Sequence, residues 1–225
     1  MNSYGIKKVT GPPPFPFLRS SPPWDAAPDL TIGNFLKESS SHRPITVVRL
    51  LYDDVTVFVL FLVKDRYVRS IRTGFQSEVW KDSCVEWFVQ PKPEKGYFNF
   101  EVNAGGALRV SYVEDPERIN GGLKKSTPLP IDLCRRVKIC HSLPEVVDPE
   151  MTDPVEWMVG ISVPLSTMEN FIGRIGDCSG QRWRANFNKC ADETSHPHWA
   201  TWNPVAEKNF HRPQDFGEIV FGRRL

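Results

Sequence analysis

The sequence predicts an all-β protein, an antiparallel β-sandwich of the immunoglobulin-like or jelly-roll type with one short helix and long loops. Several short segments alternate apolar and polar residues with the period of two that strands show. The 225 residues include 20 prolines and 15 glycines, and an all-β domain needs many turns of this kind. We expect one domain over residues 1–225, with a proline-rich N-terminal arm over residues 1–29, because sandwiches of this length bury a sizeable core.

The composition is ordinary for a soluble globular protein and argues against two kinds of binding surface. The formal net charge is +1, whereas a nucleic-acid scaffold usually carries a basic excess. The longest apolar run, Val55 to Val63, has the length of a strand and is too short to span a membrane. We therefore expect a monomer that binds neither nucleic acid nor membranes.

The N-terminal residues and the cysteines favour a reducing compartment. Met1 to Lys8 lacks the apolar core of a signal peptide, so the chain as written predicts a cytoplasmic protein. The five cysteines are odd in number and irregularly spaced, which is typical of free, buried thiols and not of a disulfide framework. These cysteines are Cys84, Cys134, Cys140, Cys178 and Cys190.

The first 35 residues predict a strand, an arm and a short apolar segment. Residues 4–10 have the composition of a first edge strand. Residues 11–29 are rich in proline, which removes backbone donors, so we expect them to lie on the domain and not inside a sheet. Trp24 is the expected anchor of this arm, and Leu30 to Phe35 is the apolar segment that follows.

A first hairpin follows. Thr46 to Tyr52 and Val55 to Lys64 are rich in β-branched and aromatic residues, and Asp53-Asp54 forms the turn between them. The second segment is apolar at nearly every position, which predicts a central strand covered on both faces.

The alternation of apolar and polar residues along two segments defines a second hairpin. Cys84 to Gln90 and Tyr97 to Asn103 both alternate with a period of two. A three-residue loop at Ala104-Gly105-Gly106, with glycine in the left-handed region, keeps apolar residues opposite apolar ones, whereas a slip of one residue would mix the faces. The expected cross-strand partners are Val102 with Leu108, Phe100 with Val110, Phe98 with Tyr112, Glu101 with Arg109, and Asn99 with Ser111.

The second half of the chain predicts a loop, a helix and more strands. Residues 114–132 are polar and rich in glycine, proline and lysine, so we expect a long loop. Ser166 to Glu169 has the sequence of a capping box and Gly173 is the expected stop, which predicts one short helix. Gln181 to Lys189 alternates, with Trp183 on its apolar face. The remaining predicted strands are residues 135–141, 155–163 and 216–221.

The chain carries more tryptophan than a core of this size needs. Of its seven tryptophans, Trp87, Trp157 and Trp183 lie within predicted strands, so we expect them in the core. Trp199 and Trp202 lie in a polar loop, where packing explains them less well. Surplus tryptophan is typical of binding surfaces.

Four motifs between about Trp24 and Phe221 carry a family resemblance. They are W-K-D-S-C-V-E-W-F, Y-F-N-F-E-V-N-A-G-G, W-R-A-N-F-N, and W-N-P followed by F-H-R-P-Q-D-F-G-E-I-V-F. With them the chain resembles the family 9 carbohydrate-binding modules. The resemblance implies a β-sandwich that holds a saccharide between two tryptophans and does not hydrolyse it, and members of the family are usually extracellular.

The resemblance also implies site residues. The family's first stacking tryptophan is matched by Trp80, its glutamate by Glu86 and its arginine by Arg109. The second tryptophan is matched best by Trp202, with Trp199 as the rival, and an asparagine of the late strand by Asn186. An indole covers the apolar face of a pyranose, while carboxylate, guanidinium and amide groups suit its hydroxyls. The expected partner is an oligosaccharide or polysaccharide.

Other readings of the same residues remain open. Glu86 and Glu101 have the residue types of a glycosidase acid and base. Cys190, His196, His198 and His211 are zinc-ligand types without a compact spacing, and no spacing marks a structural calcium site. A haem-binding electron-transfer sandwich would use a methionine and a histidine. Its candidate ligands are Met151, Met158, Met168, His141 and His211. We expect neither a metal nor a cofactor.

Overall fold

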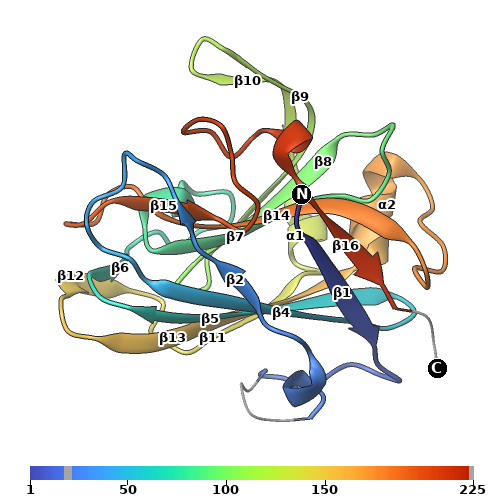
Figure 1. Ribbon diagram of the computed structural model, residues 1–225, viewed down its shortest axis with the longest axis horizontal. Helices are drawn as coiled ribbons and strands as arrows, with labels where there is room; N and C mark the ends of the chain where they lie inside the picture. The colour runs from blue at the N-terminus through green and yellow to red at the C-terminus, as the bar shows by residue number, and fades with distance from the viewer. Residues whose placement is uncertain (18–21, 223–225) are drawn as a thin grey trace.

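Two β-sheets face each other in the computed structural model, which describes residues 1–17 and 22–222 (Figure 1). This confirms the predicted sandwich. The first sheet consists, in order, of β10 (Gly122–Pro128), β9 (Leu108–Ile119), β8 (Tyr97–Asn103), β7 (Cys84–Gln90), β14 (Arg182–Ala191), β16 (Gly217–Phe221) and β1 (Ser3–Lys8). The second consists of β4 (Ile45–Tyr52), β5 (Thr56–Asp65), β13 (Val155–Pro164) and β11 (Lys138–His141), with β2 (Leu30–Ile32) beside β4.

Smaller elements cover the edges of the sandwich. Strand β15 (His198–Thr201) pairs with β14 and with β3 (Asn34–Phe35), and β12 (Val147–Met151) pairs with β6 (Val68–Ser70). The helices are α1 (Ile131–Cys134) and α2 (Leu165–Ile172), and 3-10 turns occupy Trp24–Ala26, Val79–Lys81 and Pro213–Asp215. Within the described ranges, no helix is both long and apolar enough to cross a membrane.

Strand β1 joins the two sheets. Its first half pairs in parallel with β16, with Ser3 opposite Glu218, and its end pairs in parallel with β4, with Lys7 opposite Leu51. The sequence predicted an edge strand here, which is wrong, because β1 has a neighbour on each side. Tyr4 and Ile6 point into the core and are buried.

The proline-rich arm covers the outer face of β5. Trp24 is fully buried, its ring 5.0 Å from that of Phe17, which in turn packs at 6.1 Å against Phe58 of β5. This confirms Trp24 as the anchor and β5 as a central strand covered on both faces. Residues 18–21 of the arm lie outside the described residues.

The β8–β9 hairpin has the predicted register at all five expected pairs. Asn103 N–H donates to Ala107 O at 3.2 Å, which closes the three-residue loop, and Gly106 has a φ of +87°. Parity alone therefore identified which side chains of these strands share a face, and Glu101 lies opposite Arg109.

Gly106→Ala is expected to destabilise the protein by roughly 2–4 kcal/mol, because two costs add. A left-handed φ strains any L-residue, and the added Cβ would lie 2.4 Å from His141 Cδ2. Gly121→Ala is a matched control, since Gly121 has a φ of +82° but no atom within 4 Å of a Cβ; its expected cost is about 1 kcal/mol. Urea unfolding measures both, and equal costs would contradict the packing argument.

Residues 114–128 form a hairpin and not the predicted loop. Strand β9 continues to Ile119 and pairs with β10, so that the hairpin extends beyond the sandwich (Figure 1). Ion pairs join its strands, with Lys124 Nζ 3.1 Å from Asp115 and Lys125 Nζ 2.8 Å from Glu114. The hairpin is mostly exposed, and it therefore lacks the apolar face by which a strand is recognised.

The helix prediction is correct at one end only. Helix α2 ends at Gly173, as predicted, and the φ of this glycine is +72°. The helix begins at Leu165 after Pro164, and no side chain caps it, so the predicted capping box is not used. The tryptophans expected in the core are there, since Trp87, Trp157 and Trp183 are at most 2% exposed. All five cysteines are free and buried.

A group of charged and polar side chains is buried between the sheets. Lys189 lies on the core face of β14 and is fully buried, with Nζ 3.5 Å from Asp65 Oδ2 on β5 and 2.8 Å from His198 Nε2. His42 Nε2 bonds to Asp65 Oδ1 at 2.7 Å, and Trp157 Nε1 donates to Asp65 Oδ2 at 3.2 Å. The two sheets are thus connected by an ion pair as well as by apolar packing.

Candidate functional site

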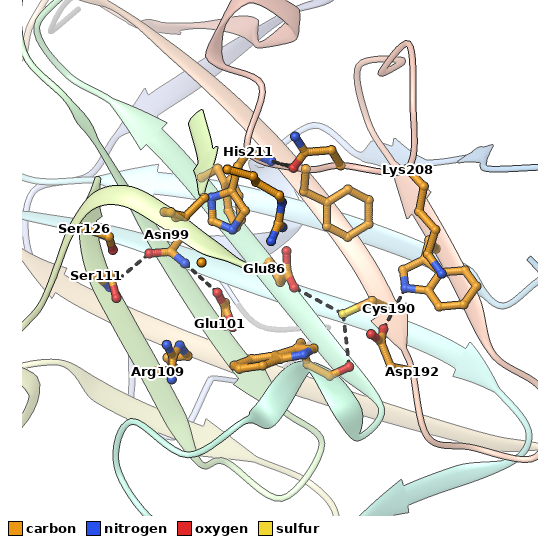
Figure 2. A pocket seen from close by; sticks show the side chains of 18 of the residues that line it. Glu86, Asn99, Glu101, Arg109, Ser111, Ser126, Cys190, Asp192, Lys208 and His211 are labelled. Atoms are coloured by element: carbon orange, nitrogen blue, oxygen red, sulfur yellow. Dashed lines mark hydrogen bonds between the residues drawn. The ribbon is translucent and has the colours of Figure 1, made fainter. Parts of the chain in front are cut away.

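A cavity of about 620 Å³ opens on the outer face of the first sheet. Its floor is made by side chains of β7, β8, β9 and β14 that sit in register, and Figure 2 shows these residues from close by. One row runs across the four strands as Asn188, Glu86, Glu101 and Arg109, of which the last three line the cavity, and the next row contains Phe88, Asn99 and Ser111. The walls come from the turn at Val79–Lys81, the loop after β15 and the β9–β10 hairpin.

Trp80 forms one wall and is held on two sides. It lies in the 3-10 turn just before β7 and is half-buried. The guanidinium of Arg109 lies 4.8 Å from the centre of its ring, and Arg109 also donates to Gln76 O at 2.9 Å. The backbone carbonyl of Trp80 accepts a hydrogen bond from Asp192 N–H at 3.2 Å. Arg109 therefore lies over the indole, the backbone bond fixes the turn that carries it, and the residue as a whole remains half-buried.

Trp199 belongs to a second wall and shares a partner with Trp80. It is half-buried on β15, and its Nε1 donates to the Asp192 carboxylate at 2.7 Å. Lys208 Nζ lies 3.2 Å from the centre of its ring. Asp192 thus links both tryptophans, through its backbone on one side and its side chain on the other. Both rings pack on the same small apolar cluster around Val79.

Two carboxyl groups form the centre of the floor. Glu86 and Glu101 lie directly opposite each other and are less than 5% exposed. Glu86 accepts hydrogen bonds from Asn188 Nδ2 at 3.1 Å and from the Cys190 thiol at 3.2 Å. Burial raises the pKa of Glu86 to about 7. Burial, and then the charge of Glu86, raise the pKa of Glu101 well above its ordinary value. At neutral pH Glu101 therefore holds a proton, and the pair can both donate and accept.

Arg109 does not neutralise these carboxyls by direct contact. Within the described part of the chain no ion pair joins Arg109 to Glu101, although the two are cross-strand neighbours. Glu101 accepts from Asn99 Nδ2 at 2.5 Å, and its other oxygen has no hydrogen-bond partner. A buried acceptor without a donor is costly, so this oxygen is suited to receive a hydroxyl from a ligand.

Of the six site residues predicted from the sequence, four line this cavity. They are Trp80, Glu86, Arg109 and Trp199. Trp202 was the preferred second tryptophan, but its side chain is only 6% exposed and packs in the core at 5.8 Å from the Phe187 ring. The structure therefore places Trp199 on the cavity wall and Trp202 in the core.

Asn186 also lies apart from the cavity. It is fully buried, and its amide bonds to the neighbouring backbone. Its Nδ2 donates to Asn203 O at 3.0 Å, while its Oδ1 accepts from the N–H groups of Phe187 and Asn203 at 3.0 and 2.9 Å. These bonds fix the start of the loop after β15, so the role of Asn186 is to position that loop.

Several lining residues were not singled out from the sequence. Asn99 and Ser111 share the face of Glu101 and Arg109, so parity could have identified them. Lys208 and the residues of the β9–β10 hairpin carry no local signal. The lining also includes Phe88, Arg118, Leu123, Ser126, Asp192 and Phe210, together with Cys190 and His211, which the sequence suggested only as metal or haem ligands.

The side chains that the sequence offered as candidate ligands for zinc and haem lie in different parts of the structure. His198 is buried against Lys189, whereas His211 lines the cavity and bonds through Nδ1 to the Tyr97 hydroxyl at 2.7 Å. Met158 and Met168 belong to different core clusters. The fold therefore brings neither set of candidate ligands together.

Comparisons with known proteins agree with this architecture. The model of carbohydrate-binding family 9 matches residues 25–221. A Bacteroides uniformis protein to which carbohydrate binding is ascribed is similar in structure, with a TM-score of 0.83 and 24% identity over 97% of this chain and 98% of its own. No curated protein matches the chain in sequence.

Two further similar structures contain a bound sugar. Both are family 9 carbohydrate-binding modules from Caldicellulosiruptor kristjanssonii, one in complex with glucose and one with cellotriose. They are each 15% identical to this chain and cover all of it, with 97% and 95% of their own chains matched and TM-scores of 0.67 and 0.68. At these identities the likeness establishes the fold.

Proposed function

The chain belongs to carbohydrate-binding family 9, and on this basis we propose that the cavity over β7, β8, β9 and β14 binds a saccharide without hydrolysing it. The observation that carries the proposal is the pair of half-buried tryptophans, Trp80 and Trp199, fixed on either side of Asp192 beside a polar floor. Two aromatic walls over a floor of donors and acceptors suit a ring that has apolar faces and a belt of hydroxyls.

The indole rings supply the apolar contact. A pyranose presents C–H groups on its faces, and an indole covers such a face with a large area and little loss of side-chain entropy. Because Asp192 and the cations Arg109 and Lys208 already hold the two rings, little freedom remains to be lost when a sugar binds. Preorganised aromatic surface of this kind favours affinity.

The floor supplies the hydroxyl contacts. Protonated Glu101 offers an O–H donor, Glu86 offers acceptor oxygens, and Arg109 offers guanidinium donors. Asn99 and Ser111, in the adjacent row, add neutral polar groups. Hydrogen bonds made by groups that are already buried gain strength from the low local dielectric, so these contacts favour one arrangement of hydroxyls over others.

Alanine replacement of either wall tests the proposal. Trp80→Ala and Trp199→Ala are each expected to weaken saccharide binding by at least about 30-fold, or about 2 kcal/mol, as for a buried aromatic contact at the centre of an interface. Titration calorimetry, with glucose and cellotriose as the first probes and a glycan array as the wider screen, measures the loss. Phe75→Ala is the matched control, because Phe75 is 44% exposed and does not line the cavity.

Both variants should keep the far-ultraviolet circular dichroism of the parent, since the two rings are half-exposed. Unchanged binding in both variants would remove the two tryptophans from the site. If the parent protein bound no saccharide on the array, the proposed function itself would be wrong.

A hydrolytic role is the second candidate, because two buried carboxyls with raised pKa values face one cavity. We expect no turnover of chromogenic glycosides, in line with a binding module. Measurable hydrolysis that is lost in Glu86→Gln and in Glu101→Gln would favour the glycosidase over the binding module.

A further inference from the structure

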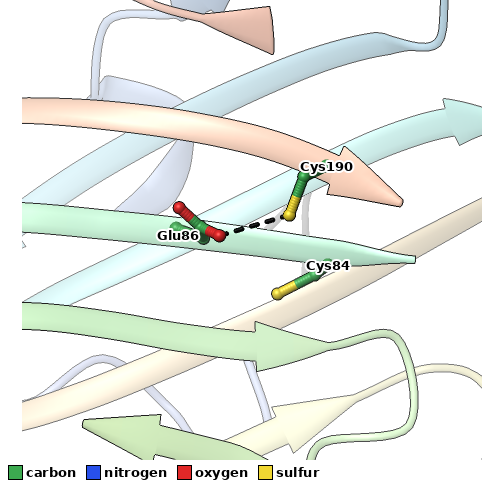
Figure 3. A group of neighbouring side chains, drawn as sticks. All are labelled: Cys84, Glu86 and Cys190. Atoms are coloured by element: carbon green, nitrogen blue, oxygen red, sulfur yellow. Dashed lines mark hydrogen bonds between the residues drawn. The ribbon is translucent and has the colours of Figure 1, made fainter. Parts of the chain in front are cut away.

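Two cysteines and a carboxylate converge at the edge of the cavity floor. Cys84 near the start of β7 lies directly opposite Cys190 on β14, and Glu86 follows two residues later on the same face of β7 (Figure 3). The two sulfur atoms and a carboxylate oxygen all lie within 4.8 Å of one another, and all three side chains are buried. The Cys190 thiol donates to Glu86 Oε1 at 3.2 Å.

Two buried polar atoms beside this cluster have no hydrogen-bond partner among the described residues. Asn188 is fully buried next to Glu86, and its Oδ1 has no hydrogen-bond partner. Glu101, on the other side of Glu86, also has an oxygen without a partner. Each such atom costs about 1–3 kcal/mol. In the part of the chain that the structure describes, no lysine or arginine pairs with Glu86.

We propose that Cys84, Cys190 and Glu86 bind one zinc-like divalent cation, with a fourth coordination position open to the cavity. Thiolate and carboxylate ligands together suit Zn²⁺, whereas Ca²⁺ and Mg²⁺ take oxygen ligands only. Three protein ligands and one open position are the pattern of zinc sites that bind an exchangeable ligand. Because Glu86 and Cys190 line the cavity, a water molecule or a ligand oxygen there can complete the shell.

The distances are compatible with this site after small side-chain movements. Zn–S and Zn–O bonds of about 2.3 and 2.1 Å place tetrahedral ligand atoms roughly 3.5–3.8 Å apart. The Cys190–Glu86 contact, at 3.2 Å, is a little shorter than this range and would have to open by about 0.3 Å. The largest separation in the cluster, at most 4.8 Å, needs to close by about 1 Å, which rotation about side-chain bonds of Cys84 can supply. The strands themselves need not move.

Cobalt substitution tests the site directly, since Co²⁺ bound by thiolates absorbs strongly in the near ultraviolet and visible. Reduced, chelator-treated protein titrated with Co²⁺ is expected to develop this absorption at one equivalent, and Zn²⁺ should displace it. Cys84→Ser and Cys190→Ser are each expected to abolish the thiolate band. Cys134→Ser is the matched control and should keep the band, because Cys134 is also buried but its thiol donates to Leu129 O, outside the cluster.

A second measurement covers variants that fold poorly. Zn²⁺ at 100 times its dissociation constant should raise the unfolding free energy of the parent by about 2.7 kcal/mol, and a chelator should reverse this. No cobalt band, or an unchanged band in Cys84→Ser, would overturn the proposal. So would a loss of two mass units in the protein before reduction that is absent from Cys84→Ser and from Cys190→Ser, which would mean a Cys84–Cys190 disulfide. No saccharide is present in these titrations, so their outcome is separate from that of the sugar-binding test.

Discussion

Lys189→Ala is expected to destabilise the protein by about 3–5 kcal/mol, a large part of the stability of a typical domain. The substitution would leave Asp65 as an uncompensated charge between the sheets, where its side chain is fully buried. It would also leave His198 Nε2 without its partner. Burial alone would raise the pKa of Asp65. The charge of Lys189 and the hydrogen bond from His42 outweigh burial and hold this pKa well below its ordinary value.

Urea unfolding of three variants separates the buried pair from an ordinary ion pair. Lys125→Ala removes a pair with Glu114 whose lysine is 65% exposed, and it should cost no more than about 1 kcal/mol. The double replacement Lys189→Met with Asp65→Leu removes both charges and should recover most of the loss, as exchanges of buried pairs for apolar residues can do. Similar costs for Lys189→Ala and Lys125→Ala would contradict the role of Lys189.

Stability is expected to change little between pH 7 and 4.5 and to fall steeply below 4.5. Burial, followed by the charge of Lys189, lowers the pKa of His198 to about 3. Burial, followed by the charge of Arg118, lowers the pKa of His211 to about 3 as well. Both histidines are neutral in the folded state, so their contribution is complete above the ordinary pKa of 6.5 and is lost as the pH falls toward 3.

The buried carboxyls act in the opposite direction over the upper part of this range. The pKa of Glu86 is about 7, above its ordinary 4.5, and that of Glu101 is higher still. A raised pKa stabilises the protonated folded state, so acidification from pH 7 to 4.5 relieves a cost and offsets the histidines. Below 4.5 this relief is complete. Each histidine then lowers the unfolding free energy by about 1.4 kcal/mol for each pH unit, so that the two together remove roughly 4 kcal/mol between pH 4.5 and pH 3. Protonation of Asp65 adds to this loss.

Urea midpoints of metal-free protein between pH 8 and pH 3.5 measure this profile. His211→Asn should flatten the fall below pH 4.5, because an amide can replace the ring nitrogen that bonds to the Tyr97 hydroxyl without taking up a proton. At pH 8 the variant should differ from the parent only by a constant offset. A stability that declines evenly from pH 7 would show that the carboxyls do not offset the histidines.

The fold was predictable wherever one face of a segment is apolar. Alternation along β7, β8 and β9 fixed the register of the hairpin, including the position of Arg109 opposite Glu101. The apolar run of β5 identified a central strand. The β9–β10 hairpin was missed because water contacts most of its side chains, so its stability comes from cross-strand ion pairs that leave no hydrophobic period.

The site was predictable only in part, because its geometry depends on contacts between distant segments. Trp199 and Trp202 lie three residues apart in a polar sequence, so the sequence does not distinguish them. The hydrogen bonds between Asn186 and Asn203 hold the segment next to Trp202, whose side chain packs in the core. Cys84 and Cys190 approach each other only because β7 pairs with β14 in one register. No local pattern encodes that choice.

The pairing of β1 with β16 has a consequence for how the chain reaches this structure. Ser3 finds its partner only at Glu218, so the first half of β1 stays unpaired until almost the whole chain is present. Such long-range pairing raises the contact order and slows folding. During synthesis the edge of β14 that pairs with β16 has to wait for this last strand, which makes early intermediates prone to aggregation.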